Sequence, residues 1–166
     1  MDTSDFIALA STVVALSALG VSIWQGYVMR EHNKLSVMPL LYVDKDTREG
    51  SDIELTVLNQ GVGPAIITSF ALYCDENQYL FPTTKQYAEI LVSLGLDPKQ
   101  QVFTADIPIE GNVIKDGSSF SVIKFIGSGQ NAELHKQITS VLPRLSLEIV
   151  YQSVYQESKM FKYVAA

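Results

Sequence analysis

The sequence predicts a membrane-anchored, mainly β protein: one N-terminal transmembrane helix followed by an immunoglobulin-like β-sandwich with two short inserted helices. Three observations predict this class. Residues 6–29 carry no charged side chain, and every Lys and Arg lies at or after position 30. Much of the remaining chain alternates apolar and polar residues over short segments, which is typical of strands with one buried face. Two further segments space their apolar residues as helices do.

The N-terminal apolar segment, FIALASTVVALSALGVSIWQGYVM, is 24 residues long. As a helix it would span roughly 36 Å, enough to cross a hydrocarbon core of about 30 Å with some tilt. A cleaved signal peptide is the alternative, but such peptides begin with basic residues, whereas this chain begins MDTSD. Trp24 and Tyr27 lie near the far end, where amphipathic rings favour the headgroup layer. We therefore expect a retained helix in contact with the lipid bilayer.

The charges beside this segment predict its orientation. Asp2 and Asp5 precede it, while Arg30 and Lys34 follow it, with Glu31 between them. Basic flanks stay on the cytoplasmic side of a membrane, and a single cysteine agrees with a reducing compartment. The expected segments are a short extracytoplasmic tail (1–5), the transmembrane helix (6–29), a juxtamembrane joint (30–35) and a cytoplasmic β-sandwich domain (36–166).

Small residues recur along the predicted transmembrane helix at alternating spacings of three and four, and the series ends at a glutamine. The members are Ala8, Ser11, Ala15, Ala18, Ser22 and Gln25. Small side chains let transmembrane helices approach closely, and a Gln in hydrocarbon is best satisfied by a partner helix. This pattern predicts a homo-oligomer formed through the helix; chance is the alternative, because ten of the 24 residues are Ala, Gly, Ser or Thr.

The remaining chain is expected to form seven or eight short strands. The candidates are residues 38–44, 53–57, 65–74, 78–81, 101–107, 120–126, 145–151 and 159–164. Helical spacing at Tyr87, Ile90, Leu91 and Leu94 predicts one helix, with Thr83 or Thr84 as its N-cap and Gly95 just past its end. A second helix is expected at Leu134, Ile138, Val141 and Leu142, and Pro143 ends it. These elements favour a β-sandwich, with a small barrel as the alternative.

The segment NQGVGPA contains the one stretch that could be a ligand-binding signature, at Asn59, Gly61, Gly63 and Pro64. A dinucleotide fingerprint would need a third glycine and then a helix, but Ile66, Ile67 and Thr68 follow instead. We therefore interpret it as a structural turn, in which Asn59 bonds nearby backbone and the glycines can adopt positive φ. The next strand is expected to bury one face: Ile66, Thr68, Phe70, Leu72 and Cys74.

The ionisable residues predict no catalytic, metal or cofactor site. Cys74 falls on the expected apolar face, so a packed thiol is favoured over a nucleophile. His32 and His135 are expected to be solvated and too distant for a zinc site. The acidic loop at Asp44, Asp46, Glu49 and Asp52 lacks the pattern of a calcium-binding hand. A net charge of −6 argues against nucleic-acid binding.

Three short motifs resemble those of poorly characterised bacterial single-pass membrane proteins with an N-terminal helix and a cytoplasmic β-rich domain. They are HNKLSVMP (32–39), which follows the helix, LNQGVGPAII (58–67), which contains the NxGxGPA turn, and YQSVYQES (151–158). The resemblance extends over nearly the whole chain and implies the same architecture in a bacterial cytoplasmic (inner) membrane. It implies no activity, and Glu31 stands where relatives would carry a second basic residue.

Two function classes remain open. The first is a non-enzymatic interaction module or subunit of a membrane complex, which presents the sandwich to an unknown protein partner. The alternative is a ligand-gated membrane effector, for example one that senses a cyclic nucleotide in phage defence. Such an effector would need clustered basic residues for phosphates, and the three arginines, Arg30, Arg48 and Arg144, are far apart in sequence.

Overall fold

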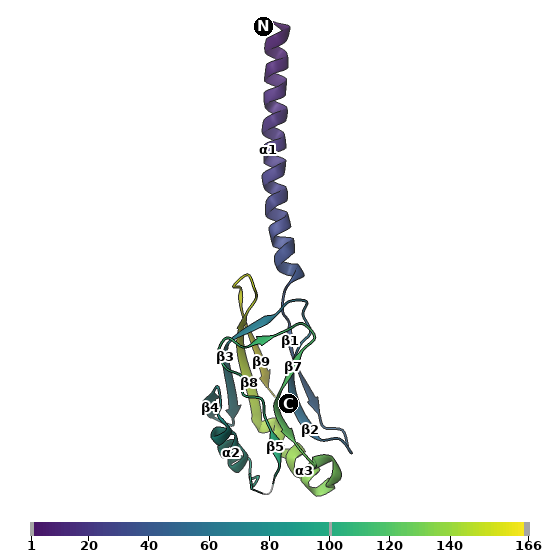
Figure 1. Cartoon of the computed structure of the whole chain (residues 1–166), viewed down its shortest axis with the longest axis vertical. Helices are drawn as coiled ribbons and strands as arrows, with labels where there is room; N and C mark the ends of the chain where they lie inside the picture. Colours follow the sequence, from purple (N-terminus) through teal and green to yellow (C-terminus); the bar gives the residue numbers. More distant parts are fainter. Residues whose placement is uncertain (1, 100, 165–166) are drawn as a thin grey trace. The chain divides into compact units, whose positions relative to one another are not determined.

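A computed structural model describes residues 2–99 and 101–164, and the chain divides between Ser36 and Val37 into two units (Figure 1). The first unit is a single helix, α1 (Thr3–Ser36), of 34 residues. At about 1.5 Å per residue it is roughly 51 Å long. It continues through residues 30–35, so the expected joint is the last part of this helix rather than a separate connection.

None of the described residues of α1 is buried within the chain. The helix is long and apolar enough to cross a membrane by length and composition. Asp5 lies in its first turn and Lys34 in its last, where each charge complements the helix dipole. Lys34 also pairs with Glu31 at 3.2 Å.

The second unit contains two antiparallel sheets. The strands of the first, in spatial order, are β1 (Leu41–Asp46), β2 (Ile53–Asn59), β7 (Ser119–Phe125) and β5 (Phe103–Thr104). Those of the second are β4 (Asn77–Leu80), β3 (Ala65–Cys74), β8 (Leu145–Gln152) and β9 (Ser158–Val164), and β6 (Val113–Ile114) also pairs with β3. The described strands therefore form two separate sheets, as a sandwich requires.

Both predicted helices are present. The first, α2 (Thr84–Ser93), begins with a capping box between Thr83 and Gln86 and is followed by Gly95 at φ +78°. The second, α3 (Ala132–Val141), is capped by the Asn131 side chain. Two short 3₁₀ turns, η1 (Ser128–Gln130) and η2 (Leu142–Arg144), flank it, and η2 contains Pro143. The caps satisfy backbone N–H groups that a helix end leaves without partners.

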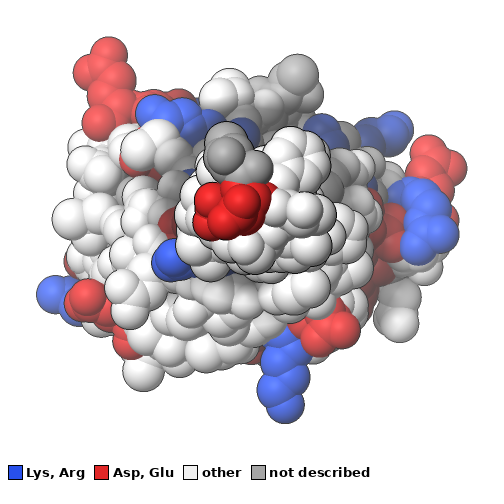
Figure 2. All heavy atoms as spheres, turned by 90° about the horizontal axis from the view of Figure 1, so that it is seen from above, with Lys and Arg blue, Asp and Glu red and all other residues white. Residues whose placement is uncertain are grey.

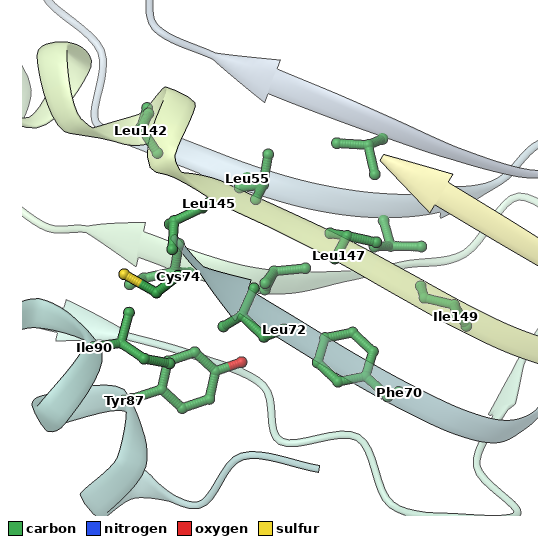
Figure 3. Packing of buried hydrophobic residues seen from close by; sticks show 14 of the residues in the cluster. Leu55, Phe70, Leu72, Cys74, Tyr87, Ile90, Leu142, Leu145, Leu147 and Ile149 are labelled. Carbon is green, nitrogen blue, oxygen red and sulfur yellow. The ribbon is translucent and has the colours of Figure 1, made fainter. Parts of the chain in front are cut away.

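The core lies between the two sheets and is closed at one end by α2 and η2 (Figure 3). Alternate residues of β2 (Ile53, Leu55, Val57) and of β8 (Leu145, Leu147, Ile149, Tyr151) are buried. The predicted alternation of these two strands is confirmed. Phe70 and Leu72 of β3 pack with them, and Tyr87 and Ile90 from α2 lie in the same cluster.

The predicted buried face of β3 is wrong in its first half. A β-bulge at Thr68 interrupts the pairing of β3 with β8, since Ile67 pairs with Tyr151 and Ser69 with Val150. Ala65 and Ile67 are buried before the bulge, and Phe70, Leu72 and Cys74 after it. An extra residue in one strand reverses the inward and outward positions, and Thr68 Oγ1 donates a hydrogen bond to the Val150 carbonyl instead of entering the core.

Two other strands differ from prediction. Only Phe103–Thr104 of the expected 101–107 segment is strand. Beyond it, the Asp106 N–H donates to the Ser121 carbonyl of β7 and the Asp106 carboxylate accepts the Ser121 N–H, both at 2.8 Å. The two-residue strand β6 was not predicted. It is too short to show a period of two, and only its pairing with Ala65 and Ile66 reveals it.

Candidate functional site

The small-residue series of α1 forms one face of a continuous helix. At 3.6 residues per turn, the six members of the series, from Ala8 to Gln25, lie within an arc of about 100° around the helix axis. Ser11 and Ser22 each donate a hydrogen bond to a carbonyl one turn earlier, both at 2.8 Å, so their hydroxyl donors are satisfied within the helix. Among the described residues, the Gln25 side chain has no hydrogen-bond partner. This face of α1 therefore carries small side chains and one amide side chain that needs a hydrogen-bond partner.

Asn59 is the centre of the β2–β3 turn. It is fully buried, and its Oδ1 accepts hydrogen bonds from the N–H groups of Leu40 (3.1 Å) and Gly61 (3.0 Å). Its Nδ2 donates to the carbonyls of Gly63 (2.7 Å) and Ile114 (3.1 Å). Four hydrogen bonds occupy both ends of the amide, so Asn59 joins three loop segments and has no free group to offer a ligand.

Gly61 and Gly63 do not adopt positive φ, contrary to the sequence-based expectation. They are required because the backbone of residues 37–40 passes against them. A Cβ on Gly61 would overlap the backbone of Met38 and Leu40, and a Cβ on Gly63 would overlap the Val37 carbonyl. Pro64 then precedes β3 directly. The turn thus packs closely on the segment that leads into β1, a contact that no local sequence pattern reveals.

A groove of about 370 Å³ lies beside this turn, between the 106–108 segment and residues 112–120. Ile67, Ile107 and Phe120 supply apolar lining, and Asp106 and Lys115 supply charged side chains. The volume falls in the range of small-ligand pockets. No sequence pattern predicts this groove, because a groove made by loops carries no periodic signal.

Cys74 and His135, the residues that could act as nucleophile and base, are both buried. Burial raises the pKa of the Cys74 thiol, which is fully enclosed in the core, so it is a poor thiolate source. His135 is buried, not solvated as expected: its Nε2 lies 3.1 Å from the Thr47 carbonyl. His135 thus faces the 47–52 loop, which is distant in sequence, so the helical pattern of α3 alone cannot show this contact.

Ion pairs occupy two of the arginines. Arg48 hydrogen-bonds the Asp46 carboxylate and lowers its pKa to about 2. Arg144 Nε donates to Asp75 Oδ1 at 2.9 Å, which lowers the pKa of Asp75, and its Nη2 donates to the Ser93 carbonyl. Within residues 2–99 and 101–164, no group of three or more His, Cys, Asp or Glu side chains could hold a metal ion.

The predicted site residues thus form two separate features. The helix face belongs to the first unit, whereas Asn59, Gly61, Gly63 and Pro64 belong to the second. The resemblance to bacterial single-pass proteins stays a prediction that rests on three motifs. A scan against protein-family models finds no match to this chain, and a search of curated proteins returns no significant match.

Proposed function

We propose that the chain is a non-enzymatic, membrane-anchored interaction module or a subunit of a membrane complex. It would be held in the bacterial cytoplasmic membrane with an immunoglobulin-like sandwich at the cytoplasmic face. One observation carries the proposal: α1 is long and apolar enough to cross a membrane, and none of its described residues is buried within the chain. Such a surface is stable only in lipid or against other apolar helices.

Self-association through α1 is the first interaction that we propose. Close packing along Ala8, Ser11, Ala15, Ala18 and Ser22 would supply van der Waals contact, and Gln25 would find an amide partner in another copy. Interhelical hydrogen bonds of this kind contribute about 0.6–2 kcal/mol in membranes. The same spacing of three and four places Met29, His32 and Ser36 on the same face of α1, although Met29 and His32 are not small.

A pair of double substitutions tests this interface. Ala15→Ile with Ala18→Ile keeps the helix apolar but prevents close approach, and we expect loss of the cross-linked oligomer in membranes. Leu9→Ile with Leu16→Ile changes the same segment more than 100° from the centre of the interface, at about 3.6 residues per turn, and should leave the oligomer intact. An equal cross-linking signal from both variants would contradict self-association through this face.

The groove beside the β2–β3 turn favours the second candidate, a ligand-gated membrane effector such as a cyclic-nucleotide sensor in phage defence. Its volume of about 370 Å³ can admit a small ligand. Its charge is less suitable: among the described lining residues Lys115 is the only cation, and Asp106 opposes an anionic phosphate. Calorimetric titration of the full-length protein with cyclic di- and oligonucleotides separates the candidates, since saturable binding that Lys115→Ala abolishes would favour the effector.

A further inference from the structure

One end of the β domain carries most of its exposed apolar loop residues. We call it the Val37 end, because the domain begins there. Its surface consists of residues 37–40, the β2–β3 turn, the loops on either side of β6, and the β8–β9 turn. The large exposed apolar side chains in it include Leu40 (52 %), Val62 (66 %), Ile109 (60 %), Val113 (53 %), Val154 (51 %) and Tyr155 (44 %).

Backbone hydrogen bonds hold these loops together as one surface. Gln60 N–H donates to the Leu40 carbonyl at 2.8 Å, which joins the β2–β3 turn to the start of β1. Ile67 N–H donates to the Asn112 carbonyl at 2.8 Å, which joins the loop before β6 to β3. Gln152, where the β8–β9 turn begins, pairs with Ile66 of β3. The exposed apolar residues are therefore presented by a supported framework.

The turns at the opposite end have a different composition. Residues 47–52, 75–76 and 127–131 expose no large apolar side chain among those the structure describes. The first two turns contain four acidic residues and Arg48. Figure 2 shows acidic and basic side chains interspersed, with neither sign gathered into one large patch in this view.

Chain continuity keeps the Val37 end close to any membrane that α1 crosses. Val37 follows Ser36, the last residue of α1, with no linker between them. The polar part of α1, residues 30–36, adds only about 10 Å beyond the apolar segment. The headgroup layer on each side of a bilayer is itself about 5–8 Å thick. The first residue of the domain is thus tethered at the outer boundary of that layer.

We propose that the Val37 end is a lipid-contact surface, in which Leu40, Val62, Val154 and Tyr155 enter the headgroup layer of the bilayer that α1 spans. This inference rests on the proposed membrane anchoring. A Tyr ring suits the boundary, since its body is apolar and its hydroxyl reaches water. Glu110 and Asp116 are exposed beside Lys115, so the charge at this end does not favour anionic lipid. Contact would therefore depend on apolar insertion and not on the anionic lipid fraction.

Fluorescence quenching of the full-length protein in lipid nanodiscs tests the surface. A bimane label is placed on Val154→Cys or, at the opposite end, on Glu49→Cys, and the nanodiscs contain lipid with a spin label on its headgroup. The native Cys74 is fully buried, and the unsubstituted protein measures its background labelling. We expect strong quenching at position 154, weak quenching at position 49, and the same result in neutral and anionic nanodiscs.

Matched variants separate insertion from mere proximity. With the label at position 154, Val62→Ser with Tyr155→Ser should reduce the quenching, whereas Val102→Ser with Ile126→Ser, at the opposite end, should not. Equal quenching at positions 154 and 49, or no quenching at 154, would overturn the lipid-contact surface. Quenching of Trp24 by lipids brominated in the acyl chains reports insertion of α1 independently. If Trp24 is quenched and position 154 is not, membrane anchoring stands and the surface proposal fails; if Trp24 is not quenched, anchoring itself fails.

Discussion

At the scale of single residues, the β2–β3 turn depends on two side-chain types for different reasons. Asn59 is required for its four hydrogen bonds in a fully buried position. Gly61 and Gly63 are required for their lack of a Cβ, because the chain of residues 37–40 occupies that space. Asn59 meets a hydrogen-bonding requirement of the fold, and the two glycines meet a steric one. Substitutions at these positions should therefore lower the free energy of unfolding whether or not any ligand binds.

Gly63→Ala should destabilise the domain more than a glycine substitution at a site of positive φ. The new Cβ would meet the Val37 carbonyl, which cannot move without displacing the start of β1. Overpacking of this kind costs about 1–3 kcal/mol, and more where backbone must shift. Gly50→Ala is the control: its φ is +84° with open space around it, so it should cost only about 1–2 kcal/mol of backbone strain. Thermal unfolding measured by circular dichroism compares the two, and a smaller loss for Gly63→Ala would contradict the steric explanation.

Asn59→Asp should make stability fall as pH rises. An ionised carboxylate there would face the carbonyls of Gly63 and Ile114, which now accept the Asn59 amide hydrogens. Because the buried charge is unfavourable, the folded-state pKa of the new Asp should lie above its unfolded value of about 3.9. The penalty relative to the natural protein is then smallest below that pH and grows above it.

Denaturant unfolding between pH 4 and pH 8 measures this difference. Asp46, whose pKa Arg48 lowers to about 2, contributes stability above about 3.8 that is lost as pH falls. That contribution is common to both proteins and cancels in the comparison. A penalty that stays constant across the range would mean that the carboxylate is solvated and that the turn opens.

At the scale of elements, the two sheets depend on strands whose inward residues contribute most of the core. In β8 four inward residues are buried and alternate with half-buried outward ones. The β8 outward residue Glu148 pairs with Lys162 of β9 at 2.7 Å. The division is strict enough that neighbouring positions should respond very differently to the same substitution.

Leu147→Asp should prevent stable folding of the β domain. Leu147 is 2 % exposed between Leu72 of β3 and Tyr163 of β9, so an aspartate would place an unpaired charge in the core at a cost of several kcal/mol. Ser146→Asp, at the adjacent outward position, should cost less than about 1 kcal/mol. Limited proteolysis of the full-length protein in membranes compares them, and equal resistance of both variants would contradict the observed register of β8.

At the scale of the whole molecule, the distribution of charge predicts the topology in the membrane. Every Lys and Arg lies at or after position 30, and the acidic Asp2 and Asp5 precede the apolar segment. The cytoplasmic side retains basic flanks, so the β domain is expected inside. The bias is small, since Glu31 pairs with Lys34, which leaves Arg30 as the unopposed basic residue nearest the span.

A reporter that fluoresces only in the cytoplasm, fused to the C-terminus, should be bright. A periplasmic alkaline phosphatase fused at the same site should be inactive, because the domain would not cross the membrane. Arg30→Glu provides the matched perturbation: it removes the nearest positive charge and should lower the bright fraction. A dark cytoplasmic reporter together with an active phosphatase would reverse the proposed orientation.

The sequence by itself determined the main elements whose signals are local. The apolar segment predicted α1, period-two alternation predicted β2 and β8, and capping residues predicted where α2 begins. These signals are local, since periodicity and caps reflect contacts within one element or one buried face.

Only the tertiary structure decided the features that depend on contacts between distant segments. The bulge at Thr68 shifts the buried face of β3, and its cause is pairing with β8, some eighty residues later. The backbone of residues 37–40 passes so close to Gly61 and Gly63 that neither position has room for a Cβ. The 47–52 loop packs against His135 and buries it. The groove and the apolar Val37 end are likewise assembled from loops far apart in sequence. A side chain's environment in such places is set by what another part of the chain brings to it, and no window of neighbouring residues contains that information.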